Sequence, residues 1–172
     1  MLVYLQMIEG PAQKSAFEQI YIQYRVLMYA VAYGILGNAQ DAEDAVHHAF
    51  VKIAENISKI SEPVCPKTKA YVVTIVENTA INLYRKKKRH PSLSYDEEAA
   101  GIAVEYSGSN ELARCMAQLP ARYRQVLLLK YHHGYSTKEI AKMLGLTAAN
   151  AAKIEQRAKA KLEIMCKEAG IL

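Results

Sequence analysis

The sequence predicts an all-α fold with two small helical domains joined by a flexible acidic linker, the C-terminal domain containing a helix-turn-helix. Hydrophobic residues make up 51% of the chain, whereas only eight of 172 residues are Gly and five are Pro. Long stretches lack the apolar–polar alternation that is typical of strands, and apolar residues recur at helical spacing instead. The last third also carries start and stop signals for two short helices joined by a tight turn.

Charge divides the chain into three parts. Residues 1–90 carry 11 basic and eight acidic side chains. Residues 91–110 carry four acidic side chains and no basic one, and residues 111–172 carry 11 basic and five acidic side chains. We therefore expect an N-terminal domain, a linker and a C-terminal domain over these three ranges. The net charge of +5 and the pI of about 9.0 suit a polyanionic partner.

Three amphipathic helices are expected in the N-terminal domain. The first, over residues 12–35, ends at Gly37, and the second follows with apolar residues at helical spacing. Carboxylates in its first turn favour the positive end of the helix dipole. These carboxylates are Asp41, Glu43 and Asp44. After a Pro-containing loop over residues 58–67, a third helix should run from Thr68 to Arg89.

Five successive cations close the third helix, from Arg85 to Arg89. They complement the negative end of the helix dipole and can simply remain solvated. A run this dense is also what a phosphate-binding surface needs. The sequence leaves both interpretations open.

The C-terminal domain should begin with a short helix over residues 111–119 and another opened by Pro120. The helix-turn-helix follows. Ser136 and Glu139 form a capping box at the start of its first helix. Gly145 supplies the positive φ that ends this helix, and Thr147 caps the next one.

The second helix of this pair has two distinct faces when successive residues are placed about 100° apart. Its core stripe is expected to contain Ala151, Ile154, Ala158, Leu162 and Met165. Polar side chains gather on the opposite face and its flanks, where Lys and Gln can address base edges and Arg can hold phosphate. The DNA-binding candidates of the motif are Lys138, Asn150, Lys153, Gln156, Arg157 and Lys159. An ordinary helical hairpin within a core is the alternative interpretation.

Three blocks in this order resemble a bacterial RNA polymerase sigma factor of the extracytoplasmic-function (ECF) group. They run from Gly37 to Phe50, from Ala70 through the basic run, and from Leu119 to Leu162. The resemblance covers roughly residues 14–90 and 111–165. It implies two partners, core RNA polymerase and promoter DNA, and it allows an anti-sigma factor as a third.

The resemblance also assigns roles to individual positions. The acidic helix would dock on the clamp helices of the β′ subunit, and its polymerase-binding candidates are Asp41, Glu43, Asp44 and His48. The third helix would help melt and hold the minus-ten element, and its DNA-binding candidates are Asn78, Asn82, Arg85, Lys86, Lys87, Lys88 and Arg89. The C-terminal domain would read the minus-thirty-five element and pack on the β flap.

The chain departs from the family pattern at several places. His47 and His48 stand where a Gln and an acidic residue are usual, and Asn82 stands where an Asp is usual. In the recognition helix, Ala151 and Ala152 replace a β-branched and a basic residue.

An enzyme, a metal site and a cofactor are not expected. Each His pair, at 47–48 and 132–133, consists of adjacent residues that a helix points in different directions. There is no Gly-rich phosphate loop and no nucleophile elbow. A conventional helix-turn-helix regulator is the better alternative, in which residues 1–90 sense or dimerise and the last helices bind an operator without polymerase.

A cytoplasmic protein without membrane insertion is expected. The start of the chain lacks the pattern of a signal peptide, and the longest apolar run, Val26 to Leu36, is too short to span a bilayer. The three cysteines, Cys65, Cys115 and Cys166, lack metal-ligand spacing and are expected to be reduced thiols.

Overall fold

The computed structural model describes residues 1–87 and 111–171, and within these ranges the chain forms helices and no strand. The chain divides into two compact units, Met1–His90 and Pro91–Leu172. The all-α prediction is confirmed. The linker expected over residues 91–110 lies outside the described residues, as do Lys88 and Arg89.

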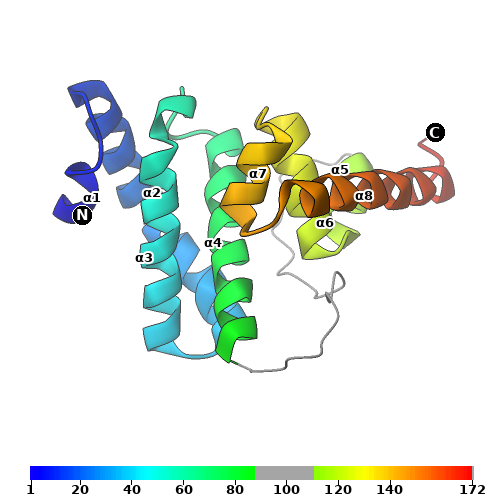
Figure 1. The fold of residues 1–172 in the computed structure, drawn as a ribbon, viewed down its shortest axis with the longest axis horizontal. Helices are drawn as coiled ribbons and strands as arrows, with labels where there is room; N and C mark the ends of the chain where they lie inside the picture. The colour runs from blue at the N-terminus through cyan, green and yellow to red at the C-terminus, as the bar shows by residue number, and fades with distance from the viewer. Residues whose placement is uncertain (88–110, 172) are drawn as a thin grey trace. The chain divides into compact units, whose positions relative to one another are not determined.

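The first unit is built around three long helices that pack against one another. Its elements are α1 (Leu2–Leu5), α2 (Pro11–Leu36), α3 (Ala39–Glu55), the 3-10 turn η1 (Ile57–Lys59) and α4 (Pro66–Lys87). Figure 1 shows α2, α3 and α4 side by side. Gly37 ends α2 with a φ of 64°, and the Asn38 side chain accepts a hydrogen bond from the backbone N–H of Asp41 at 3.0 Å.

The core of this unit lies on the predicted faces of α2 and α3, with a small shift. Phe17 and Phe50 are buried, and their ring centres lie 5.9 Å apart. On α2, Met28 is fully buried, whereas Tyr21 and Leu27 are half-buried. The apolar stripe of α2 therefore faces both neighbouring helices rather than one, since α2 packs on α3 and α4 alike.

A short N-terminal helix, α1, was not anticipated from the sequence. Its Tyr4 is buried against Phe17 and Phe50, with ring-centre distances of 5.5 and 5.7 Å. The Tyr4 hydroxyl lies 2.7 Å from Nδ1 of His47. A helix of four residues has no readable period, and its position depends on contacts with α2 and α3.

The second unit arranges shorter helices around one long helix. Its elements are α5 (Glu111–Gln118), α6 (Ala121–Leu127), the π-helical segment η2 (Leu128–His132), α7 (Thr137–Leu144) and α8 (Ala148–Glu168). Helices α5, α6 and α7 all pack on α8.

The turn between α7 and α8 has the predicted local chemistry. The backbone N–H of Glu139 donates to Ser136 Oγ at 3.3 Å, and the Ser136 N–H donates to the Glu139 carboxylate at 2.9 Å. Gly145 has a φ of 66°, and Thr147 accepts a hydrogen bond from the N–H of Asn150 at 3.2 Å. The predicted capping box, stop residue and second cap are confirmed. Across residues 1–87 and 111–171, no helix has the length and apolar character needed to cross a bilayer.

Candidate nucleic-acid interface

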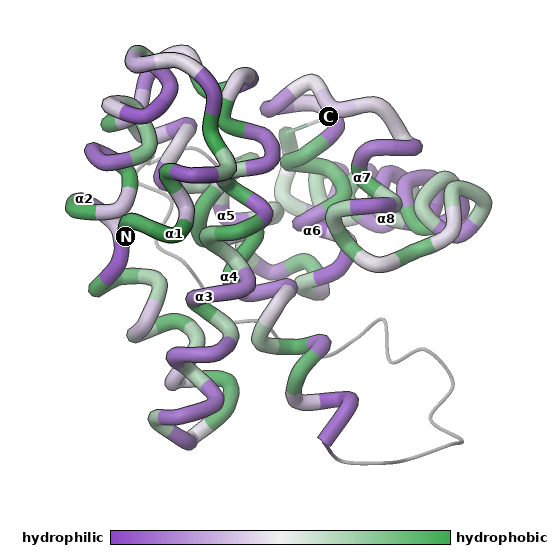
Figure 2. Tube along the Cα trace, turned by 60° about the vertical axis from the view of Figure 1, so that its left-hand side comes forward, coloured by the Kyte–Doolittle hydropathy of each residue, from purple (hydrophilic) through white to green (hydrophobic). Residues whose placement is uncertain are grey.

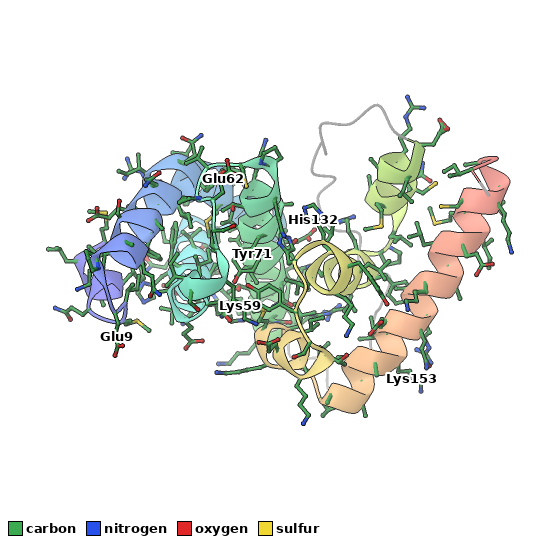
Figure 3. The ribbon with its side chains drawn as sticks, turned by 90° about the horizontal axis from the view of Figure 1, so that it is seen from above. Glu9, Lys59, Glu62, Tyr71, His132 and Lys153 are labelled. Carbon is green, nitrogen blue, oxygen red and sulfur yellow. The ribbon has the colours of Figure 1, made fainter. Side chains whose placement is uncertain are left out.

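Helix α8 separates a buried face from a polar one, as expected. Ala151, Ile154 and Ala158 are at most 2% exposed, whereas Lys153 and Gln156 are exposed. Lys153 projects from α8 away from the other helices of this unit (Figure 3). Towards the end of the helix the buried stripe shifts by one residue. Here Cys166 is buried, and the expected core residues Leu162 and Met165 are half-buried.

The exposed polar side chains of the motif form the surface that we call the α8 face. Its members, all exposed, are Lys138, Asn150, Lys153, Gln156, Arg157 and Lys159. They occupy α7 and the first half of α8. The major groove of B-DNA is wide enough to admit a helix that carries such side chains.

Lys159, on the α8 face, has two partners within the protein. Its Nζ lies 3.5 Å from the Glu155 carboxylate and 4.8 Å above the centre of the Tyr131 ring. The Tyr131 hydroxyl donates to the same carboxylate at 2.5 Å. The contact with Tyr131, followed by the charge of Glu155, raises the pKa of Lys159. A phosphate contact by Lys159 would therefore compete with Glu155.

Two arginines of the second unit, Arg122 and Arg124, are buried and contact backbone carbonyl oxygens. Arg124, 2% exposed, donates from Nη1 to the backbone oxygens of Ala117 at 3.0 Å and Leu119 at 3.1 Å. These carbonyls belong to the end of α5, where a helix leaves acceptors without helical partners. Arg122 is also buried, and its Nη1 lies 3.5 Å from the backbone oxygen of Leu144. Sequence reasoning did not identify either role, because the basic type alone does not distinguish a buried arginine from an exposed one.

In the first unit, the structure brings together two candidate residues that the sequence assigned to different partners. Asp41, in the first turn of α3, forms an ion pair with Lys87, in the last turn of α4. The Asp41 side chain is only 13% exposed, compared with 57% for Lys87. Figure 1 shows the start of α3 and the end of α4 at the same end of this unit, and Figure 2 shows that this end of α4 is hydrophilic. Asp41 is therefore a less accessible carboxylate than its neighbours.

Glu43, Asp44 and His48 are exposed on α3. Of these three residues, Glu43 lines a pocket of about 420 Å³ between α1, α2 and α3. It is lined by Tyr4, Tyr21, Arg25, Val26, Tyr29, Glu43, Val46, His47 and Phe50. Val26, which lines this pocket, is 73% exposed, and Ile22, one turn before it on α2, is 69% exposed. We call the three exposed polar side chains, this pocket and the exposed apolar residues of α2 the α2–α3 groove.

The candidates on α4 occupy its second half. Asn82 Nδ2 lies 3.5 Å from Asn78 Oδ1, one helical turn away. Asn82 and Arg85 are half-buried and Lys86 is exposed. Asn78 is fully buried, so a contact between its amide and DNA requires a rearrangement around it.

Over the described ranges, no group of three or more His, Cys, Asp or Glu side chains is placed to hold a metal ion. The two adjacent His pairs instead make ring contacts, with ring centres 5.9 Å apart at positions 47–48 and 4.9 Å apart at 132–133.

The family comparison divides the chain as the structure does. Residues 20–90 match Sigma-70 region 2, and residues 109–162 match Sigma-70, region 4. The chain is 29% identical to ECF RNA polymerase sigma factor SigW of Bacillus subtilis over 77% of this chain and 79% of that protein. It is 24% identical to ECF RNA polymerase sigma factor SigL of Mycobacterium tuberculosis, over 93% of this chain and 94% of the relative. RNA polymerase sigma factor SigZ of Bacillus subtilis is 28% identical over 70% of each chain.

Proposed function

The chain belongs to the Sigma-70 family of RNA polymerase sigma factors, in its ECF group, and from this premise we propose how its own residues divide the work. A sigma factor of this kind binds core RNA polymerase and directs promoter recognition and transcription initiation. This role requires surfaces that bind polymerase and DNA, and it does not require the chain to catalyse a reaction. Three surfaces are involved, namely the α2–α3 groove, the end of α4 and the α8 face.

The α8 face reads the minus-thirty-five element in this proposal. The observation that carries it is the arrangement of α8, whose buried stripe turns Lys153 and Gln156 outwards behind a tight turn with a confirmed capping box. Helices held in this way enter the major groove with their N-terminal half. The end of α4, with Asn82, Arg85 and Lys86, holds the minus-ten element.

The α2–α3 groove docks on polymerase, at the clamp helices of its β′ subunit. Support comes from two exposed carboxylates of α3, Glu43 and Asp44. Glu43 lines the pocket together with Val26, an exposed apolar side chain of α2. An interface of this kind combines an apolar centre with polar edges. Asp41 contributes less to docking, because Lys87 already neutralises it.

Reversing two charges tests this docking site. Glu43→Lys with Asp44→Lys should abolish co-purification with core polymerase and promoter-specific run-off transcription, while helicity by circular dichroism stays unchanged. The matched control is Glu55→Lys with Glu62→Lys, which makes the same charge change at other exposed positions of this unit. Retained polymerase binding in the first variant would place the docking site elsewhere.

A second comparison separates this function from that of an operator-binding regulator. The chain alone should bind promoter fragments poorly, and core polymerase should make the binding specific. A fragment from upstream of its own gene is a suitable first template. Tight, specific binding without polymerase would favour the regulator.

The finer features of the proposal rest on the family. The C-terminal unit packs on the β flap, the chain acts in the cytoplasm with its polymerase, and an anti-sigma factor is a candidate third partner. Such a partner would compete with polymerase for the α2–α3 groove.

A further inference from the structure

Two cysteines that are distant in sequence meet inside the C-terminal unit. Cys115 lies on α5 and Cys166 near the end of α8, and these two helices pack together. Both side chains are buried, 6% and 3% exposed, and Cys115 is close enough to raise the pKa of the Cys166 thiol. Neither belongs to the α8 face, so promoter reading gives no reason for the pair.

Solvent reaches one of the two thiols through a pocket of about 330 Å³. It is lined by Glu111, Arg114, Cys115, Gln118, Met165, Glu168 and Ala169. Cys115 thus lines a space large enough for a small oxidant, whereas Cys166 does not line it. Arg114 and Glu111 also line this space and form an ion pair with each other, with 3.1 Å between Nη1 and Oε1.

The two thiols differ in their environment. Burial raises the pKa of the Cys166 thiol, and the neighbouring Cys115 raises it further. Cys115 lines the pocket and Cys166 does not, so Cys115 is the thiol that a small oxidant from solvent reaches first.

We propose that Cys115 and Cys166 form a reversible intramolecular disulfide when the protein meets hydrogen peroxide. The Cys115 sulfur attacks one peroxide oxygen and the O–O bond breaks. Cys115 becomes a sulfenic acid, and the leaving hydroxide takes up the thiol proton to form water. The Cys166 sulfur then attacks the sulfenic sulfur, and the hydroxide released takes the second thiol proton to form a second water. Two thiols are oxidised and one hydrogen peroxide molecule is reduced. A dithiol reductant reverses the step.

This inference does not depend on the proposed function, because it concerns the far end of α8 from the α8 face. The bond would join α5 to the end of α8 across about fifty intervening residues. Closing a loop of this length restricts the unfolded chain, so the oxidised protein should unfold at a higher temperature.

The experiment uses the full chain with Cys65→Ser, which removes the half-exposed third thiol and leaves only the pair. Stoichiometric hydrogen peroxide should remove both thiols together, lower the intact mass by two hydrogens and leave a monomer on a non-reducing gel. Dithiothreitol should restore both thiols. The oxidised form should unfold at a temperature several degrees higher than the reduced form.

The controls remove one partner at a time, as Cys65→Ser with Cys115→Ala and Cys65→Ser with Cys166→Ala. Peroxide should raise the unfolding temperature of neither. The proposal is overturned if the Cys65→Ser protein keeps both thiols, gains oxygen on cysteine without a cross-link, or forms only dimers. Because this protein retains both partners, the result stands even if an alanine variant fails to fold.

Discussion

Lys153, Gln156 and Arg157 occupy one turn of α8, yet their positions suit different tasks. Lys153 and Gln156 project opposite the buried Ile154 and Ala158. In the proposed complex they would face the floor of the DNA major groove. Arg157 lies at the flank of the same face, closer to where a DNA backbone would pass.

Replacing these side chains one at a time should separate sequence reading from affinity. Lys153→Ala and Gln156→Ala should each cost about 1–3 kcal/mol of discrimination at one or two base positions. Arg157→Ala should weaken binding to all upstream elements alike, because a phosphate contact carries no sequence information. Transcription from a randomised promoter library measures both effects. A change of base preference with Arg157→Ala alone would mean that α8 is rotated by about a third of a turn from this placement.

A charge swap tests the Asp41–Lys87 ion pair. Asp41→Lys should lower stability, because it places two cations together and removes a carboxylate from a helix start, each effect being worth about 1 kcal/mol or less. Adding Lys87→Glu should restore part of the lost stability. Thermal unfolding of both variants is the measurement. Equal unfolding temperatures for Asp41→Lys and the unaltered protein would show that the pair is unimportant in solution.

Elements with their own start and stop signals were predictable from sequence, and elements that depend on neighbours were not. Helix α7 carries its capping box and terminal glycine within its own sequence. Helix α1 is too short for a periodic pattern and is held by Tyr4 in an aromatic cluster assembled by the fold. The π-helical segment η2 likewise continues α6 without a local signal that distinguishes it from an α-helix.

The candidate site was predictable to the same extent. The polar face of α8 follows from helical spacing, and its exposure agrees with that prediction. Glu155 is one turn before Lys159 on α8, so that ion pair could be read from helical spacing. The Tyr131 ring beside Lys159 and the Lys87 partner of Asp41 come from other elements, so no pattern within α8 or α3 could indicate them. The roles proposed for these residues in binding stay predictions.

Arg124 gives a prediction for the junction between α5 and α6. Arg124→Met keeps the approximate volume of the side chain but leaves the carbonyls of Ala117 and Leu119 without their donor. The expected loss of stability is about 1–3 kcal/mol. Urea unfolding followed by circular dichroism measures it, with Arg114→Met as the control, since Arg114 is an exposed arginine of α5. Equal losses in both variants would contradict a specific role for Arg124.

For the molecule as a whole, two basic units are tied together by a short acidic segment. Each unit alone offers DNA a small surface, and tethering raises the effective concentration of the second contact once the first has formed. Affinity for promoter DNA should therefore depend on both units and should fall steeply with salt.

The end of α4 is expected to contribute to this salt dependence. Lys86→Ala should weaken open-complex formation on every promoter and reduce the slope of log affinity against log salt by about 0.9 if it neutralises one phosphate. Lys69→Ala is the control, because Lys69 is exposed in the first turn of the same helix. An unchanged slope for Lys86→Ala would leave its charge as a solvated complement to the helix dipole.

The Asp41–Lys87 ion pair would couple the binding of polymerase to the binding of DNA in the first unit. Asp41 and Lys87 cannot stay paired if Lys87 moves to a phosphate, and Asp41 then presents a bare carboxylate to polymerase. Thermodynamic linkage makes the effect reciprocal, since a basic group that draws Asp41 away releases Lys87 towards DNA by the same factor. An exposed pair is worth at most about 1 kcal/mol, so each partner would strengthen the other by no more than about fivefold. Positive cooperativity of this modest size would favour the ternary complex over either binary one.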